Sequence, residues 1–133
     1  MGFASSDEVV TYIGGIFKDA FADPEIGPKL TATGQVFRFV FTDPEATVCV
    51  DAPTQSVGDG TGQPPPAATM RMAAEVGNAY WQGKVNLPMA MAKGQITVQG
   101  NVASLLKLAP LGKRLFPVYI ARLHDTGRAD LLL

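Results

Sequence analysis

The sequence predicts an α+β fold in which a mixed sheet is covered by a layer of helices. Segments with the apolar period of a helix alternate along the chain with short segments that have the two-residue alternation of a strand. A chain of 133 residues is long enough for one hydrophobic core and too short for two ordinary domains. Apolar residues make up 47% of it and charged residues 17%, which excludes disorder throughout. We therefore expect a single domain over residues 1–133.

The first element is expected to be an amphipathic helix that begins near Ser5. Ser5 and Glu8 have the spacing of a capping box, in which each side chain accepts a hydrogen bond from the backbone amide of the other residue. An apolar stripe follows, mostly at intervals of three and four residues, formed by Val9, Ile13, Ile16, Phe17, Ala20 and Phe21. Gly14 and Gly15 weaken the middle of this helix, so they indicate close approach of another element. The helix is expected to end before Asp23.

Two strands joined by a tight turn come next. The three phenylalanines of residues 36–41 fall on one face of the first strand. Asp43 and Pro44 are typical turn residues, and residues 47–52 have the composition of the return strand. Residues 53–67 contain glycines at alternate positions and three consecutive prolines, which do not fit a helix or a paired strand. We expect this segment to be a mobile loop.

The second half of the chain is expected to alternate between short helices and strands. Glycines that follow the helices and the alternation within the strands set the boundaries. Strands are predicted over residues 69–73 and 95–99, and helices over 75–82, 87–93, 102–108 and 113–123. Pro110 is expected to end the third of these helices, and Pro117 either starts or kinks the last one.

Few residues are suited to catalysis or metal binding. The chain has one cysteine, Cys49, and one histidine, His124, so it forms no internal disulfide and offers no cluster for a structural zinc ion. A nucleophilic dyad of Cys49 and His124 is one hypothesis. However, cysteines within strands are mostly inert packing residues, and the acidic residues here lie at helix and turn positions. We therefore expect no enzyme activity, no metal site, no cofactor and no nucleic-acid partner.

Charge is distributed unevenly along the chain. Residues 1–70 contain nine acids and three bases, for a net charge of −6, whereas residues 71–133 contain eight bases and three acids, for +5. Residues 76–124 contain no acid, and their bases are Lys84, Lys93, Lys107, Lys113, Arg114 and Arg122. The pattern is consistent with a solvated surface and equally with a surface that faces an anionic partner.

The apolar residues are spread over short elements and form no long run. None approaches the roughly 18–20 residues of a membrane span, and the N-terminus lacks the pattern of a secretory signal. We expect a cytoplasmic protein. Four methionines, Met70, Met72, Met89 and Met91, lie in predicted strands and helices. Their flexible side chains either fill gaps in the core or line an apolar site that adapts to a ligand.

The segment that begins at Ala79 contains an ordered series of short motifs. They are Gly83-Lys84-Val85-Asn86, Met89-Ala90-Met91, Gly94, Ile96-Thr97-Val98, Gly100-Asn101 and Leu106-Lys107-Leu108. In this order, and without a gap, they resemble the C-terminal half of the sterol carrier protein type two family, the nonspecific lipid transfer proteins. The resemblance is specific over residues 69–111 and topological over residues 5–52. The chain departs from the family pattern at Gly77, within a predicted helix, and at Leu87, which separates the asparagine from the proline.

The resemblance implies a mixed, mainly five-stranded sheet with helices packed over one face and an apolar tunnel between them. It also implies a binding site for sterols, fatty acids or fatty acyl-CoA without covalent chemistry. The tunnel-side positions that it implies are Trp81, Met89, Met91, Ile96, Val98, Leu105 and Leu108. Phe39 and Leu111 are added from strand alternation and position.

The leading hypothesis is therefore a noncatalytic module that binds and transfers a hydrophobic ligand. The alternative is an accessory subunit that presents an apolar substrate to a partner enzyme. A carrier exchanges its ligand at a membrane, a coenzyme A headgroup or a partner protein, and the basic half of the chain is suited to a transient contact with an anionic membrane surface.

Overall fold

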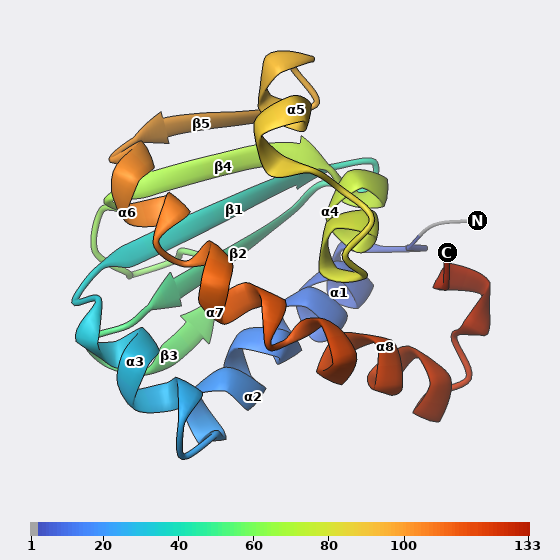
Figure 1. Ribbon diagram of the computed structural model, residues 1–133, viewed down its shortest axis with the longest axis horizontal. Helices are drawn as coiled ribbons and strands as arrows, with labels where there is room; N and C mark the ends of the chain where they lie inside the picture. Colours follow the sequence, from blue (N-terminus) through green and yellow to red (C-terminus); the bar gives the residue numbers. More distant parts are fainter. Residues whose placement is uncertain (1–2) are drawn as a thin grey trace.

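The computed structural model describes residues 3–133 and contains one mixed, five-stranded sheet (Figure 1). The strands lie in the order β3-β2-β1-β4-β5, with β1 and β4 parallel and the other neighbours antiparallel. Their bounds are β1 Val36–Thr42, β2 Ala46–Asp51, β3 Ser56–Gly58, β4 Ala68–Ala73 and β5 Ile96–Gly100. The predicted α+β class with a mainly five-stranded mixed sheet is confirmed.

Helices cover one face of the sheet, with the N-terminal and C-terminal helices packed side by side (Figure 1). In the N-terminal half they are α1 Ser6–Val9, the π-helical turn η1 Val10–Gly14, α2 Gly15–Ala22 and α3 Ile26–Ala32. In the C-terminal half they are α4 Ala74–Trp81, α5 Leu87–Ala92, α6 Val102–Leu106, α7 Ala109–Lys113, α8 Phe116–Asp125 and the 3₁₀ turn η2 Ala129–Leu131. None of these helices is long and apolar enough to cross a membrane.

The N-terminal helix begins as predicted and is divided by its glycines. The Ser5 side chain accepts a hydrogen bond from the Glu8 amide at 3.3 Å, as a capping box requires. The π-helical turn η1 ends at Gly14, and α2 continues from Gly15. A Cβ atom added to Gly15 would overlap the guanidinium group of Arg122 in α8, so this glycine permits the close approach that the sequence indicated.

A short helix that sequence analysis missed follows the first one. The Asp23 carboxylate accepts hydrogen bonds from the amides of Glu25 and Ile26 at 2.8 and 2.9 Å, and α3 begins there. These two bonds favour the ionised carboxylate and lower the pKa of Asp23. Asp23 therefore follows the end of α2, as predicted, and its carboxylate also accepts hydrogen bonds at the start of α3, which was not predicted.

The prediction that residues 53–67 contain no strand is wrong. Three of them, Ser56–Gly58, pair with β2 as the edge strand β3, in which Val57 lies opposite Val50. These residues precede the three consecutive prolines, so the backbone amides that the pairing needs are available. In the turn between β1 and β2, the Asp43–Pro44 peptide bond is cis.

Two prolines in the C-terminal half start helices. α6 ends at Leu106, so the predicted helix over residues 102–108 is shorter than expected. Pro110 does not end this helix but lies in the first turn of the next one, α7. Pro117 starts α8, where the missing amide has no helical partner to lose.

Candidate functional site

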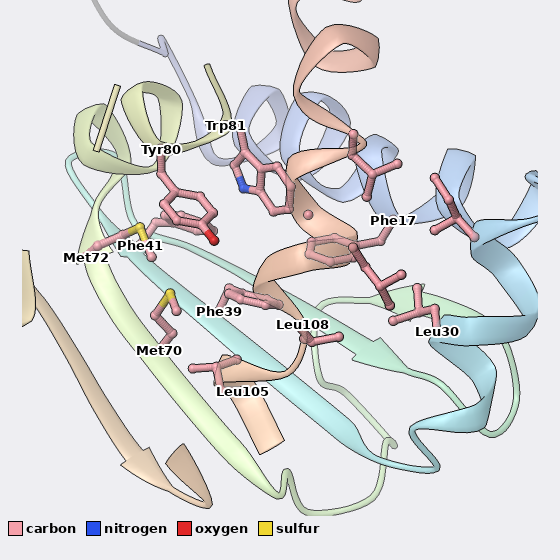
Figure 2. Close-up of a pocket in the computed structure, with 14 residues that line it drawn as sticks. Phe17, Leu30, Phe39, Phe41, Met70, Met72, Tyr80, Trp81, Leu105 and Leu108 are labelled. Carbon is pink, nitrogen blue, oxygen red and sulfur yellow. The ribbon is translucent and has the colours of Figure 1, made fainter. Parts of the chain in front are cut away.

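A small apolar cavity lies between the inner face of the sheet and the helices (Figure 2). The sheet contributes Phe39 and Phe41 from β1 and Met70 and Met72 from β4. Alternation puts both pairs on the helix-covered face, and the parallel register puts Phe39 beside Met70 and Phe41 beside Met72. The floor of the cavity is therefore a two-by-two patch of phenylalanine and methionine.

Aromatic side chains form one side wall. The Phe17 ring from α2 stacks on Phe39 with 5.2 Å between centroids, and it meets the Trp81 indole edge to face at 5.4 Å. Tyr80 meets Trp81 at 5.3 Å and Phe116 at 5.8 Å, both nearly perpendicular. These offset and edge-to-face contacts are the favoured geometries of aromatic pairs, so they fix the orientation of the wall.

A second wall comes from the short C-terminal helices α6 and α7 and the turns beside them. It consists of Leu105, Leu108, Leu111, Gly112 and Leu115. Asn101 caps α6 by accepting a hydrogen bond from the Ser104 amide at 3.0 Å, and this fixes the start of the helix. Each of these two helices has five residues and little hydrogen bonding of its own, so the wall depends on the packing of its leucines.

Five of the nine residues predicted for the site line the cavity: Phe39, Trp81, Leu105, Leu108 and Leu111. The other four lie outside its lining. Ile96 and Val98 are on β5, paired with Met72 and Met70, one strand farther from the cavity. Met91 is half-buried on α5, and Met89 on the same helix is 54% exposed. Ligand contact by these four stays a prediction.

Several lining residues were not among the predicted site residues, although the sequence contained signals for some of them, including the two methionines of β4 that it offered as either core or site residues. Phe41 alternates with Phe39, and the same alternation along β4 places Met70 and Met72 on one face. Ile26 and Leu30 also line the cavity, but they come from α3, which was not predicted. Only the packing of α3 against α2 brings them to the site.

The cavity is narrow in this conformation. Its volume is about 30 Å³, which is room for about two water molecules. Sites that enclose a drug-sized ligand have volumes of roughly 300–1,000 Å³. The side-chain nitrogen and oxygen atoms of its lining are the Tyr80 hydroxyl and the Trp81 indole nitrogen. What the structure shows is thus a narrow apolar cavity, and the open tunnel stays a prediction.

The Cys49 and His124 side chains are not placed as a dyad. Cys49 is fully buried and alternates with Val48 and Val50, which face the helices, so its thiol is on the opposite face of the sheet. Burial raises the pKa of this thiol. His124 is exposed on α8, in the helical layer. Within residues 3–133, no group of three or more His, Cys, Asp or Glu residues could hold a metal ion.

Two bases of the acid-free segment are neutralised by acids from the N-terminal half. Arg114 pairs with Glu25 at 2.8 Å and Arg122 pairs with Asp19. The Arg114 guanidinium lowers the pKa of the Glu25 carboxyl through this contact. Among residues 3–133, Lys84, Lys93, Lys107 and Lys113 are exposed and form no ion pair. Of the six bases that the anion-facing interpretation used, only these four lysines remain unpaired among the residues that the structure describes, and contact with an anionic partner stays a prediction.

Residues 16–113 match the SCP-2 sterol transfer family. The fold is similar to the solution structure of sterol carrier protein domain 2 of Helicoverpa armigera, with a TM-score of 0.69 and 21% identity over 88% of this chain and 95% of that one. It is also similar to palmitated SCP2L2 from Aedes aegypti, with a TM-score of 0.61 and 23% identity over 78% of this chain and 93% of that one.

A third similar structure is the ubiquinone synthesis protein UbiJ-SCP2, with a TM-score of 0.61 and 13% identity over 82% of this chain and 96% of that one. A search of curated proteins gave no match. The family match covers most of the chain and includes every cavity-lining residue except Leu115. It confirms the family that the motifs after Ala79 predicted: this chain belongs to the SCP-2 sterol transfer family.

Proposed function

We propose that the protein binds one long-chain hydrophobic ligand, a sterol, a fatty acid or a fatty acyl-CoA, in the apolar cavity and transfers it without catalysing a reaction. The observation that carries the proposal is the lining itself, in which 12 of 14 residues have neither a nitrogen nor an oxygen atom in the side chain. The similar fold of palmitated SCP2L2 supports an acyl ligand. Phe39, Trp81, Leu105, Leu108 and Leu111 are the proposed ligand contacts.

The free energy gained by burying a long acyl chain is comparable to the cost of binding it. Burial of about 16 methylene groups at roughly 0.8 kcal/mol each gives about 13 kcal/mol. Association and ordering cost roughly 4–15 kcal/mol, so the net affinity is modest. A modest affinity suits a carrier, because a carrier must release its ligand as well as bind it.

Binding requires the cavity to open, because about 30 Å³ does not hold such a ligand. We infer that the wall formed by α6 and α7 moves outward, since these two helices are short and are joined by turns. The free energy needed for opening lowers the observed affinity. Ile96 and Val98 become ligand contacts if the opened cavity extends beneath β5.

A noncatalytic role is supported by the placement of the reactive side chains. The sheet separates the Cys49 thiol from His124, and burial keeps this thiol protonated by raising its pKa. We place the action of the protein in the cytoplasm, where a single free cysteine is stable.

The alternative function is that of an accessory subunit that presents an apolar substrate to a partner enzyme. The fold similarity to the ubiquinone synthesis protein UbiJ-SCP2 favours it. The two functions differ in what the isolated protein does. A carrier binds lipid before any partner is added. A subunit that acts only as part of an enzyme binds lipid stably only with its partner present.

Trp81 provides the test, because it is the only tryptophan and lines the cavity. Palmitate, hexadecan-1-ol and cholesterol are titrated separately into the isolated protein while Trp81 emission is recorded. We expect a saturable change with at least one ligand. Leu105→Lys should abolish it, because a buried unpaired charge costs several kcal/mol in an apolar cavity.

Ala103→Lys is the matched control, because Ala103 lies on the same helix and is exposed. It should leave binding unchanged. Circular dichroism verifies that both variants are folded, and Leu111→Gln replaces Leu105→Lys if the latter unfolds. The proposal is wrong if none of the three ligands saturates the wild-type protein below its solubility limit, or if folded Leu105→Lys or Leu111→Gln binds normally.

A further inference from the structure

Tyr80 lies at the boundary between the cavity and a groove on the surface. The groove, called here the Lys113 groove, runs between the segment after α4 and the helices α6 to α8. Its lining includes Tyr80, Val85, Leu87, Leu106, Lys113 and Phe116. Its volume is about 370 Å³, compared with about 30 Å³ for the narrow cavity. Tyr80 lines both spaces, so movement of its side chain would connect them.

The Tyr80 hydroxyl has no partner in the described part of the chain. The hydroxyls of Tyr12 and Tyr119 donate hydrogen bonds to Thr126 and Asn78, but the Tyr80 hydroxyl makes no hydrogen bond within residues 3–133. It points into the pocket (Figure 2). Burial raises the pKa of Tyr80, so the phenol stays protonated and remains a donor at neutral pH. A half-buried donor without a partner is a position where a ligand gains a hydrogen bond.

Lys113 supplies a positive charge to the same groove. It is the one charged residue in the lining of the groove, and within residues 3–133 it forms no ion pair. Its chain neighbour Gly112 lies near the Tyr80 hydroxyl, because a Cβ atom added to Gly112 would lie 4.0 Å from the hydroxyl oxygen. The phenol and the segment that carries the ammonium group are therefore adjacent.

The Tyr80 phenol lines both the apolar cavity and the groove, and the groove lining contains an ammonium group that is unpaired within the described chain. This arrangement matches an amphiphile with a single apolar chain and an anionic head. We propose that the Lys113 groove is the portal of the cavity, with the Tyr80 ring as its gate, and that the Tyr80 hydroxyl and Lys113 hold the carboxylate of a long-chain fatty acid. This inference rests on the proposed lipid-binding function and adds the entry route, the orientation of the ligand and the residues that hold its head.

The first test compares ligands that differ only in the head. Lys113→Gln should weaken palmitate binding about tenfold, because a hydrogen bond to a charged group is lost, and should leave hexadecan-1-ol binding unchanged. Lys93→Gln is the matched control, because Lys93 is exposed and lies outside the groove. Tyr80→Phe should weaken palmitate binding several-fold, and its effect should not add to that of Lys113→Gln if both groups hold one carboxylate.

The second test concerns the gate. In stopped-flow measurements with palmitate, Tyr80→Ala should raise the association rate, because removal of the ring opens the groove to the cavity. Equal effects of Lys113→Gln on palmitate and hexadecan-1-ol would overturn the assignment of Lys113 to the carboxylate. An unchanged association rate in Tyr80→Ala would overturn the gate. If Leu105→Lys still abolishes binding in either case, the cavity is used but entered elsewhere, and the proposed function stands.

Discussion

At the residue scale, a buried polar network attaches the C-terminal residues to α4. The Tyr119 hydroxyl donates to the Asn78 side-chain oxygen at 2.6 Å, and the Asn78 amide donates to the Leu131 carbonyl at 2.8 Å. Gln82 donates to the same two acceptors and accepts from the Leu133 amide at 2.8 Å. Tyr80 and Trp81 lie between Asn78 in α4 and Gln82 at its C-terminal cap, so the network holds the backbone that carries the aromatic wall of the cavity.

Tyr119→Phe should lower the free energy of unfolding by about 1 kcal/mol, because one buried hydrogen bond is lost while the ring stays packed. Tyr12→Phe is the matched control. Its hydroxyl bonds to Thr126 in an exposed position, and the expected loss is less than about 0.5 kcal/mol. Urea unfolding followed by Trp81 fluorescence measures both. Equal losses in the two variants would contradict a stabilising role for the buried network.

At the element scale, two helical glycines differ in what surrounds them. A Cβ atom added to Gly77 in α4 would lie 2.7 Å from a ring carbon of Phe41, so this glycine lets α4 pack directly on β1. A Cβ atom added to Gly112 in α7 would lie 3.6 Å from the Trp81 ring, which is ordinary contact. Gly77 departs from the family pattern in the sequence, and the close approach of Phe41 is the physical reason for it.

Alanine substitutions at these positions should have effects of opposite sign. Gly112→Ala should stabilise the protein by about 0.5–1 kcal/mol, because alanine loses less backbone entropy in a helix. Gly77→Ala has the same favourable effect on backbone entropy, but the overlap of the new Cβ atom with Phe41 should make the substitution destabilising by about 1–3 kcal/mol. Both changes in the free energy of unfolding are measured from the midpoints of urea unfolding curves, provided that the dependence of that free energy on urea concentration is unchanged. A stabilising Gly77→Ala would mean that Phe41 relaxes at little cost.

Displacement of Phe41 would also narrow the cavity that it lines. Gly77→Ala should therefore weaken palmitate binding as well as lower the stability. Binding that is unchanged in a destabilised Gly77→Ala variant would show that the ring moves away from the cavity.

At the scale of the whole molecule, folding partly cancels the charge asymmetry of the chain. Glu25 and Asp19 from the acidic half pair with Arg114 and Arg122 from the basic half. These pairs attach α7 and α8 to the N-terminal helices and leave unpaired lysines on the C-terminal half. Such lysines are suited to an anionic bilayer, where each base near the surface contributes about 1 kcal/mol.

Ligand transfer to anionic vesicles should therefore be faster than to neutral ones and should slow with salt. The Debye length falls from about 10 Å at 0.1 M to about 3 Å at 1 M, which screens the attraction. Lys84→Gln with Lys107→Gln should reduce the preference for anionic vesicles, whereas Lys18→Gln with Lys29→Gln, in the acidic half, should not. Transfer of a fluorescent fatty acid measures the rates. Rates that are independent of vesicle charge and salt would leave the lysines with a solvating role only.

Local sequence patterns determined most of the secondary structure and five of the 14 residues that line the site. Side-chain alternation in β1 and β4, the Ser5 cap and the order of motifs after Ala79 all act between residues close in the chain, so they are visible in the sequence. They predicted the α+β sheet, the family and five lining residues. They did not predict β3, because its three residues become a strand only by pairing with β2.

The narrow cavity, its boundary at Tyr80 and the pairing of charges depended on tertiary structure. Each arises where segments distant in the chain meet: Tyr80 packs against Phe116, α3 brings Leu30 to the sheet, and Arg122 reaches Asp19 across 103 residues. The sequence by itself determined which faces are apolar, because the periodicity of a strand or helix is a property of the local chain. Only the packing of those faces decided how much space remains between them, because side-chain volumes fill a core only when their partners are fixed.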